Sequence, residues 1–203
     1  MTDLEALLRE SAGGLDGPSP ALPDLIAAAT GAGLLDVAYA TLDSPLGELL
    51  LAATPRGLVR VCYLDGGLEA ALDQLAARVS PRVLAAPRAL DRARRELDEY
   101  FAGARRDFDL ALDWQLAVGF GRRVLQATAA IPFGAVSSYG QVAAAAGSPR
   151  GARAAGNALG ANPLPIVVPC HRILHAGGGL GGYTGGVERK RVLLDIEGRS
   201  ALM

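Results

Sequence analysis

The chain has 203 residues, half of them hydrophobic, and a formal net charge of −1 at pH 7. This length fits one or two small domains with an ample apolar core. The composition excludes a membrane-spanning protein, since no uninterrupted apolar stretch approaches the roughly 18 to 20 residues of a span. With only Cys62 and Cys170, it also excludes a disulfide scaffold.

The first segment, residues 1–35, is expected to form a partly ordered extension without recognisable chemistry. Its start, Met1 to Glu5, is acidic where a secretory signal would be basic, so we interpret the chain as cytoplasmic. A turn-rich stretch over 13–20 separates two short apolar runs.

Alternating apolar and polar residues follow in three runs, 37–42, 48–52 and 58–64. Short turn sequences separate these runs, and the pattern predicts an antiparallel meander. Apolar residues at helical spacing then predict two helices, over 68–79 and 89–102. Cys62 falls within the third run and is interpreted as a core strand residue.

The second half begins with a helix signal at Ser138, which has Gln141 three residues later in the form of a capping box. We expect this helix to reach about residue 146. Ser148 can cap a second helix over 150–159, and so tight a connection is a candidate helix-turn-helix. Arg150, Arg153 and Asn157 would share its polar face.

A proline-framed run, 163–172, places Cys170 between a proline and His171. The run predicts a short buried strand over 166–168. A free cysteine titrates near pH 8.5, so a neighbouring base or cation such as His171 or Arg172 would favour its thiolate. An isolated Cys-His pair is nevertheless more often a core cysteine with an incidental neighbour.

Charge is distributed unevenly between the two ends of the chain. Residues 1–55 contain eight acidic residues and one basic residue, whereas residues 137–203 contain seven basic and three acidic residues. Such asymmetry is a weak indication of a nucleic-acid face.

Several motifs in order resemble the O6-alkylguanine-DNA alkyltransferase family. They lie within about 131–198 and, more weakly, at 99–103 and 44–49. Within the first range they read Ser-Tyr-Gly-Gln at 138–141, Arg-Ala-Ala-Gly at 153–156, Pro-Cys-His-Arg at 169–172, Gly-Gly-Tyr-Thr-Gly-Gly at 181–186 and Leu-Leu-Asp-Ile-Glu-Gly at 193–198.

The resemblance implies an α+β fold in two domains. Residues 36–112 would form a small ribonuclease-H-like scaffold with antiparallel strands. Residues 113–203 would form a mainly helical, winged-helix or helix-turn-helix-like domain that binds DNA and accepts the alkyl group.

The resemblance also implies repair by stoichiometric, single-turnover alkyl transfer from O6-alkylguanine in double-stranded DNA to Cys170. His171 would take the thiol proton through a water, and Glu197 would orient the imidazole. Tyr139 would hydrogen-bond the flipped guanine and help to protonate it as it leaves. The second helix of the candidate helix-turn-helix, over 150–159, would be the recognition helix, and Asn162 would tie it to the active-site segment. Arg172 would be structural.

The same resemblance assigns DNA contacts and a substrate pocket. Arg153 would fill the gap that the flipped base leaves in the duplex. The other predicted DNA-binding residues are Arg150, Ala152, Gly156, Asn157 and Ser138. The predicted pocket is lined by Tyr139, Val168, Ile173, Tyr183 and Thr184, with the glycine-rich run 177–182 as a mobile wall.

No cofactor, metal or membrane partner is expected, and we expect a monomer. The chain lacks a four-ligand zinc set of the kind that some relatives carry. The sequence leaves open the range of alkyl groups, activity on O4-alkylthymine, cooperativity along DNA and the purpose of residues 1–35. Gly121 and Leu125 depart from the usual Gln and Trp of relatives, from which we expect altered packing.

Two other classes of function compete with alkyl transfer. A cysteine hydrolase would also use a thiol, an imidazole and an acid, although adjacent Cys and His are unusual there. A lesion-binding module without chemistry is known among relatives that replace the cysteine, which this chain keeps.

Overall fold

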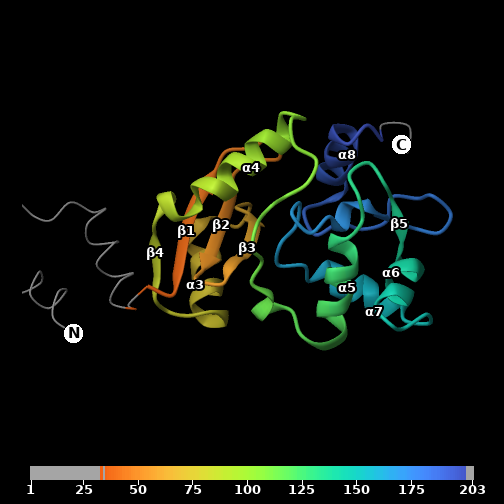
Figure 1. Ribbon diagram of the computed structural model, residues 1–203, viewed down its shortest axis with the longest axis horizontal. Helices are drawn as coiled ribbons and strands as arrows, with labels where there is room; N and C mark the ends of the chain where they lie inside the picture. The colour runs from red at the N-terminus through yellow and green to blue at the C-terminus, as the bar shows by residue number, and fades with distance from the viewer. Residues whose placement is uncertain (1–32, 34, 200–203) are drawn as a thin grey trace, which may run out of the picture.

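The computed structural model describes residue 33 and residues 35–199, which form two units side by side (Figure 1). A sheet with helices makes up the N-terminal unit, and the C-terminal unit is mainly helical, so the predicted α+β class is confirmed. The predicted extension lies outside the described residues, except for Gly33 and Leu35.

The sheet is built from the three predicted runs. Strands β1 (Val37–Leu42), β2 (Leu49–Thr54) and β3 (Gly57–Tyr63) pair antiparallel in sequence order, which confirms the meander. A short fourth strand, β4 (Val83–Ala85), pairs parallel with β1, and the strand order is β3-β2-β1-β4. Strand β3 is therefore the edge that faces the C-terminal unit (Figure 1).

Helices cover both faces of this sheet. Leu50 and Leu51 on β2 are fully buried and point to opposite faces, because successive strand side chains alternate. Leu50 packs in one cluster with Leu75 of α3 (Leu68–Arg78). Leu51 packs in the other with residues of α4 (Asp91–Phe101), which follows the 3₁₀ turn η1 (Pro87–Leu90). Both predicted helices are confirmed.

Gly57 brings the connection between the units against the sheet. A Cβ built at Gly57 would lie 2.2 Å from the carbonyl oxygen of Ala111, so only glycine fits there. The close approach lets Leu58 donate its N–H to that oxygen at 2.8 Å, and Asp113 donates back to the Leu58 carbonyl at 2.8 Å. The turn η2 (Trp114–Leu116) follows, and the chain then enters the second unit.

The C-terminal unit packs its first helix, α5, against two further helices, α6 and α7. Two very short strands, β5 and β6, pair in parallel beside them. The elements are α5 (Gly119–Ala129), β5 (Ser137–Ser138), α6 (Tyr139–Ala145), α7 (Ala152–Gly160), η3 (Cys170–Arg172), β6 (Ile173–Leu174) and α8 (Val187–Ile196).

Helix α6 begins as predicted, whereas α7 does not. The Ser138 hydroxyl accepts the Gln141 N–H, and the Gln141 side chain accepts the Ser138 N–H, which completes the capping box. Ser148 does not cap α7. Its carbonyl accepts the Gly151 N–H at 2.8 Å, so residues 148–151 form a turn and Arg150 precedes the helix.

The two positions that depart from the family pattern both lie on α5. A Cβ at Gly121 of α5 would lie at ordinary contact distance, 3.7 Å, from the Cβ of Ala158 on α7. Leu125, one turn further on, is 2% exposed in the core. Position 121 therefore faces α7, and a Cβ would fit there.

A single apolar cluster runs from the sheet into the C-terminal unit. A backbone hydrogen bond also crosses between the units, from the Val61 N–H on edge strand β3 to the Pro163 carbonyl at 2.9 Å. Pro163 begins the segment that leads to Cys170, so the first unit directly supports that segment. None of the helices described is sufficiently long and apolar to cross a membrane.

Candidate active site

Asn162 organises the chain that leads to Cys170. Its carbonyl oxygen accepts the Leu164 N–H at 3.0 Å, which closes a local turn. Its amide nitrogen donates to the Val168 carbonyl at 2.9 Å and to the Cys170 sulfur at 3.2 Å. One buried side chain thus fixes both ends of the segment and touches the thiol.

The predicted strand over 166–168 is absent, since these residues form a buried turn. Val168 donates its N–H to the Leu164 carbonyl at 2.8 Å, which folds the chain back on itself. Ile166 has a φ of 74°, a conformation that costs a β-branched residue about 1 to 3 kcal/mol. The contacts of Asn162 and the enclosing core hold this strained backbone in place.

Cys170 opens the turn η3 and is only 5% exposed. Burial raises the pKa of its thiol to about 11, although the Asn162 hydrogen bond and the positive charge of Lys190 act in the opposite direction. The resting side chain is therefore a neutral thiol. It needs a proton acceptor before it can act as a nucleophile.

His171, the next residue, is a buried imidazole. Its Nε2 lies 2.9 Å from Oε1 of Glu197, and both side chains are completely buried. Burial lowers the pKa of His171, so the imidazole is neutral at neutral pH. Because a carboxylate only accepts, Nε2 carries the proton and Nδ1 keeps its lone pair. Within the described chain, Nδ1 is buried and has no hydrogen-bond partner.

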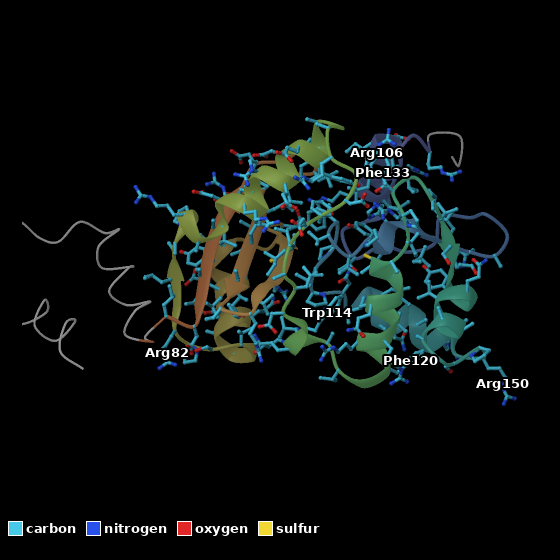
Figure 2. All side chains as sticks on the ribbon, viewed as in Figure 1. Arg82, Arg106, Trp114, Phe120, Phe133 and Arg150 are labelled. Atoms are coloured by element: carbon cyan, nitrogen blue, oxygen red, sulfur yellow. The ribbon has the colours of Figure 1, made fainter. Side chains whose placement is uncertain are left out.

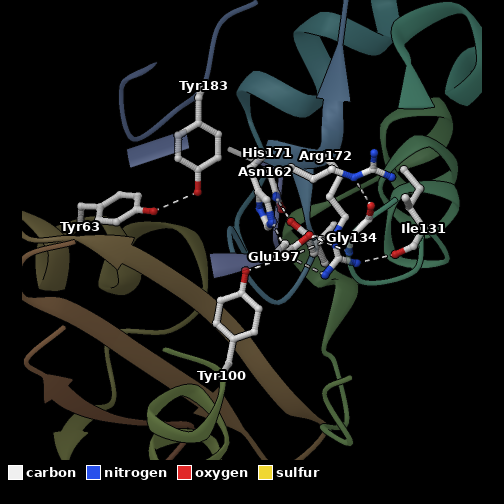
Figure 3. A network of polar contacts seen from close by, with 11 residues as sticks. Tyr63, Tyr100, Ile131, Gly134, Asn162, His171, Arg172, Tyr183 and Glu197 are labelled. Carbon is white, nitrogen blue, oxygen red and sulfur yellow. Dashed lines mark hydrogen bonds and ion pairs between the residues drawn. The ribbon is translucent and has the colours of Figure 1, made fainter. Parts of the chain in front are cut away.

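Glu197 is held by four donor residues from three parts of the chain (Figure 3). Besides His171 it accepts from the Tyr100 hydroxyl at 2.8 Å, from the Arg172 guanidinium at 2.8 to 3.1 Å and from the Gly134 N–H at 3.1 Å. Burial alone would raise the pKa of Glu197, but the hydrogen bonds from His171 and Arg172 lower it to about 2. The carboxylate stays ionised and fixes the imidazole.

Lys190 is a second buried cation at the site, and it is the only lysine in the chain. Its ammonium donates to the carbonyls of Ile173 at 2.5 Å, of Gly182 at 3.5 Å and of Leu180. Burial lowers the pKa of Lys190 to about 8. It ties together the two ends of the 174–182 loop, a task for which a compact ammonium with three donors is suited.

A cavity of about 570 Å³ opens onto Cys170 between α7, the start of α6 and the loop before α8. The Thr184 hydroxyl donates to the Gly160 carbonyl at 3.1 Å, which ties that loop to the end of α7. The lining residues are Tyr139, Ala152, Arg153, Gly156, Leu159, Gly160, Cys170, His175, Gly182, Tyr183 and Thr184.

The aromatic wall of the cavity is formed by Tyr139 and His175. Their ring centroids are 5.4 Å apart and the planes are tilted by 42°. Tyr139 lies under α7, where a Cβ at Gly156 would be only 3.7 Å from its ring. Burial raises the pKa of Tyr139, so its hydroxyl keeps a proton that it can donate.

Two residues that were predicted to line the pocket lie elsewhere in the structure. Val168 and Ile173 do not line the cavity, and both side chains are fully buried in the core behind Cys170. They adjoin the cysteine in sequence, but the turn over 166–168 and the short strand β6 direct them inward.

The predicted DNA-contacting side chains divide between the cavity and the outer surface. Arg153, Ala152 and Gly156 line the cavity, and Arg153 is exposed as well. Arg150 and Asn157 are exposed away from it, and Arg150 points outward from the end of the C-terminal unit (Figure 2).

Residues with metal-binding side chains do not gather at this site or elsewhere in the described chain, where no group of three or more His, Cys, Asp and Glu comes together. Cys62 lies on β3, half-buried at the edge of the cluster between α3 and the sheet, and it is a free thiol, as is Cys170.

Two family models match the chain. Residues 37–114 match the ribonuclease-like domain of 6-O-methylguanine DNA methyltransferase, and residues 119–199 match its DNA-binding domain. This chain belongs to the 6-O-methylguanine DNA methyltransferase family. The resemblance inferred from the sequence motifs is confirmed.

Individual members of the methyltransferase family are similar to this chain over most of their length. A methylated-DNA--protein-cysteine methyltransferase of Mycolicibacterium paratuberculosis is 41% identical over 163 residues, 80% of this chain and 93% of the relative. The constitutive enzyme of that name from Bacillus subtilis is 39% identical over 160 residues, 78% of this chain and 94% of its own.

Solved structures of family members agree with the fold. An O6-methylguanine methyltransferase from Mycobacterium tuberculosis has a TM-score of 0.68 at 39% identity, covering 82% of this chain and 94% of that one. A structure of OGT from the same organism in complex with DNA has the same TM-score and identity, over 81% and 94%.

Within the methyltransferase fold, four residues at or beside the site were not expected from the sequence. These are Tyr63, Tyr100, His175 and Lys190. For Lys190 the sequence offered one signal, because it is the single lysine among the 20 lysine and arginine residues. The other three act through contacts between distant segments, such as the Tyr100 bond to Glu197 across 97 residues.

Proposed function

We propose that this chain repairs O6-alkylguanine in double-stranded DNA by moving the alkyl group irreversibly to Cys170. The observation that carries the proposal is the buried pair of His171 and Glu197 beside Cys170, with the unpartnered Nδ1 of His171 as proton acceptor. Family membership supports DNA and the alkyl group as the substrate class.

The first step makes the nucleophile. Nδ1 of His171 accepts the thiol proton through a bridging water, and Glu197 stabilises the imidazolium that forms. The thiolate of Cys170 gains the Asn162 amide as a donor and the nearby charge of Lys190 as electrostatic support. Proton transfer leaves the net charge of the site unchanged, which suits a buried location.

The second step moves the alkyl group. The Cys170 sulfur forms a bond to the alkyl carbon while the carbon–O6 bond breaks, and the electron pair stays on the guanine. Tyr139 donates a proton to the leaving base, and the imidazolium of His171 releases the thiol proton through solvent, so that the Tyr139 phenolate is reprotonated and His171 returns to its neutral form. A thioether is a poor leaving group, and among the described residues no second thiol lines the cavity, so the protein acts once.

DNA would approach along α7. A guanine within a duplex cannot bring its O6 substituent to a buried sulfur, so the base must be flipped into the cavity at a cost of a few kcal/mol. Arg153 stands at the rim of the cavity and would fill the gap in the base stack. Arg150 and Asn157 would contact the backbone, Gly156 would permit close approach, and we propose a monomer as the active form.

Mass spectrometry of the Cys170 peptide tests this proposal. Incubation with a duplex containing O6-methylguanine should add the mass of one CH₂ to that peptide in the wild type, stoichiometrically. Cys170→Ala should leave both the protein and the lesion unchanged. Unmodified wild type with continuing product would instead support a hydrolase, and tight binding with an intact lesion would support a binding module.

A further inference from the structure

Two tyrosines from different units meet at the edge of the cavity. The hydroxyl of Tyr63, the last residue of β3, lies 2.9 Å from the hydroxyl of Tyr183, in the loop before α8 (Figure 3). Their ring centroids are 6.4 Å apart and the planes stand at 71°. The N-terminal unit, which carries no predicted catalytic residue, thus reaches a wall of the cavity.

Tyr183 is placed between this contact and the reacting groups. Its ring lines the cavity with Cys170 and stands edge-on to His171, at 84° and 6.4 Å between centroids. Among residues 35–199, only Tyr63 forms a hydrogen bond with the Tyr183 hydroxyl. The neighbouring residues on its loop are glycines and Thr184, and its ring packs against the apolar cluster that includes Cys170.

Arg189 of α8 holds Tyr63 in turn. Its guanidinium lies 4.1 Å from the centroid of the Tyr63 ring, close enough for a cation–π interaction. Asp65 accepts two hydrogen bonds from it, both at 2.6 Å, and the carbonyl of Leu46 accepts a third at 2.8 Å. The Tyr63 ring is therefore fixed from both units.

Gly185 makes room for the contact. A Cβ built there would lie 2.4 Å from the ring of Tyr63 and 2.9 Å from that of Tyr183. The absence of a side chain lets the two hydroxyls approach, and the Gly185 carbonyl accepts a hydrogen bond from Arg189 at 3.1 Å. Burial raises the pKa of Tyr63 to about 12 and also raises that of Tyr183, so both hydroxyls stay protonated at neutral pH.

We propose that Tyr63 is a positioning residue that sets where the Tyr183 ring stands over the alkyl group, and that it thereby helps to determine which O6 substituents react. This inference rests on the proposed alkyl transfer to Cys170. A methyl group is small and depends on a fixed wall to keep it in line with the sulfur. A benzyl group fills the space itself and depends less on the wall.

Single-turnover rates on two duplexes, one with O6-methylguanine and one with O6-benzylguanine, test the inference. Tyr63→Phe removes only the hydroxyl, and its benzyl-to-methyl rate ratio should rise by about threefold to tenfold, the effect of one hydrogen bond. Tyr183→Phe removes the same bond. The double variant should therefore show the same benzyl-to-methyl rate ratio as each single variant, and the two single effects should not multiply.

Tyr39→Phe is the matched control. Tyr39 lies on β1 against the cluster on the α3 side, away from the cavity, and its substitution should leave the ratio unchanged. Because the ratio compares two substrates on one preparation, partial unfolding of a variant lowers both rates equally and cancels in the ratio.

Each outcome has a distinct meaning. An unchanged ratio in Tyr63→Phe, or a double variant that multiplies the two single effects, would overturn the positioning role of Tyr63. A wild type whose Cys170 peptide stays unmodified with both duplexes would instead overturn the proposed function.

Discussion

Replacing Glu197 by glutamine tests the buried charge network most severely. The change keeps the shape of the side chain but removes its charge, which leaves the Arg172 guanidinium buried and unpaired. Breaking a buried pair in this way costs about 3 to 5 kcal/mol. The pKa of Glu197 gives a similar magnitude, because its lowering from 4.5 to about 2 corresponds to about 3 kcal/mol.

The pH dependence of this contribution has a defined sign. Since folding lowers the pKa of Glu197, its stabilising effect is fully present above pH 4.5 and is lost as the pH falls toward 2. Wild type should therefore lose stability through that window, and Glu197→Gln should lose about 3 kcal/mol less across it. At pH 7 the variant should unfold roughly 6 to 12 °C earlier.

Urea unfolding from pH 7 to pH 2 and thermal unfolding at pH 7 measure both effects. Glu99→Gln is the control, because Glu99 pairs with Arg105 at 2.7 Å on a part-exposed surface, where a pair contributes up to about 1 kcal/mol. If the free energy of unfolding of Glu197→Gln lay within about 1 kcal/mol of that of wild type and fell in the same way at low pH, the ionised network would not be what secures His171.

Two further predictions concern DNA and the buried lysine. Arg153→Ala should slow the reaction with duplex O6-methylguanine about tenfold to a hundredfold, yet leave the reaction with free O6-benzylguanine within about twofold of wild type. Only the duplex requires a flipped base. Equal losses of single-turnover rate on both substrates would contradict insertion of Arg153 into the base stack. Folding lowers the pKa of Lys190 from 10.5 to about 8, so between these pH values the folded state binds fewer protons than the unfolded state. The free energy of unfolding of wild type, measured relative to that of Lys190→Met, should therefore rise from pH 8 to pH 10.5. Parallel urea titrations at pH 7, 8, 9 and 10 measure that difference, and a flat difference would show that the ammonium is not desolvated.

Local signals in the sequence predicted those parts of the fold that local interactions determine. The meander follows from alternation and turn residues, and α6 follows from the Ser138–Gln141 capping box. The start of α7 was predicted too early, because Gly147 and Gly151 favour a turn that no capping rule for Ser148 anticipates.

The segment before Cys170 shows where local rules fail. Three prolines and an apolar run indicated a strand over 166–168, but Asn162 bonds to Val168 and Cys170 and folds the run into a buried turn. The strained φ of Ile166 is possible only with this tertiary support. Val168 and Ile173, which the family resemblance assigned to the pocket, point into the core because of that turn and of the short strand β6.

Motif resemblance predicted the candidate catalytic residues, whereas their geometry depends on how the whole chain folds. Cys170 and Glu197 lie far apart in sequence, and the partners that hold them come from both units. No local pattern predicts that Tyr100 bonds to Glu197 or that Tyr63 reaches Tyr183 across 120 residues. These contacts depend on how the sheet edge docks against the C-terminal unit.

The central claim, a single-use acceptor at Cys170, is tested most directly by counting repaired guanines per protein molecule. A known amount of protein is incubated with a large excess of duplex O6-methylguanine until the product no longer increases. The account predicts a plateau at one guanine per protein molecule, reached as the Cys170 peptide becomes fully methylated. Product that continues beyond one equivalent, or a plateau reached with Cys170 unmodified, would contradict it.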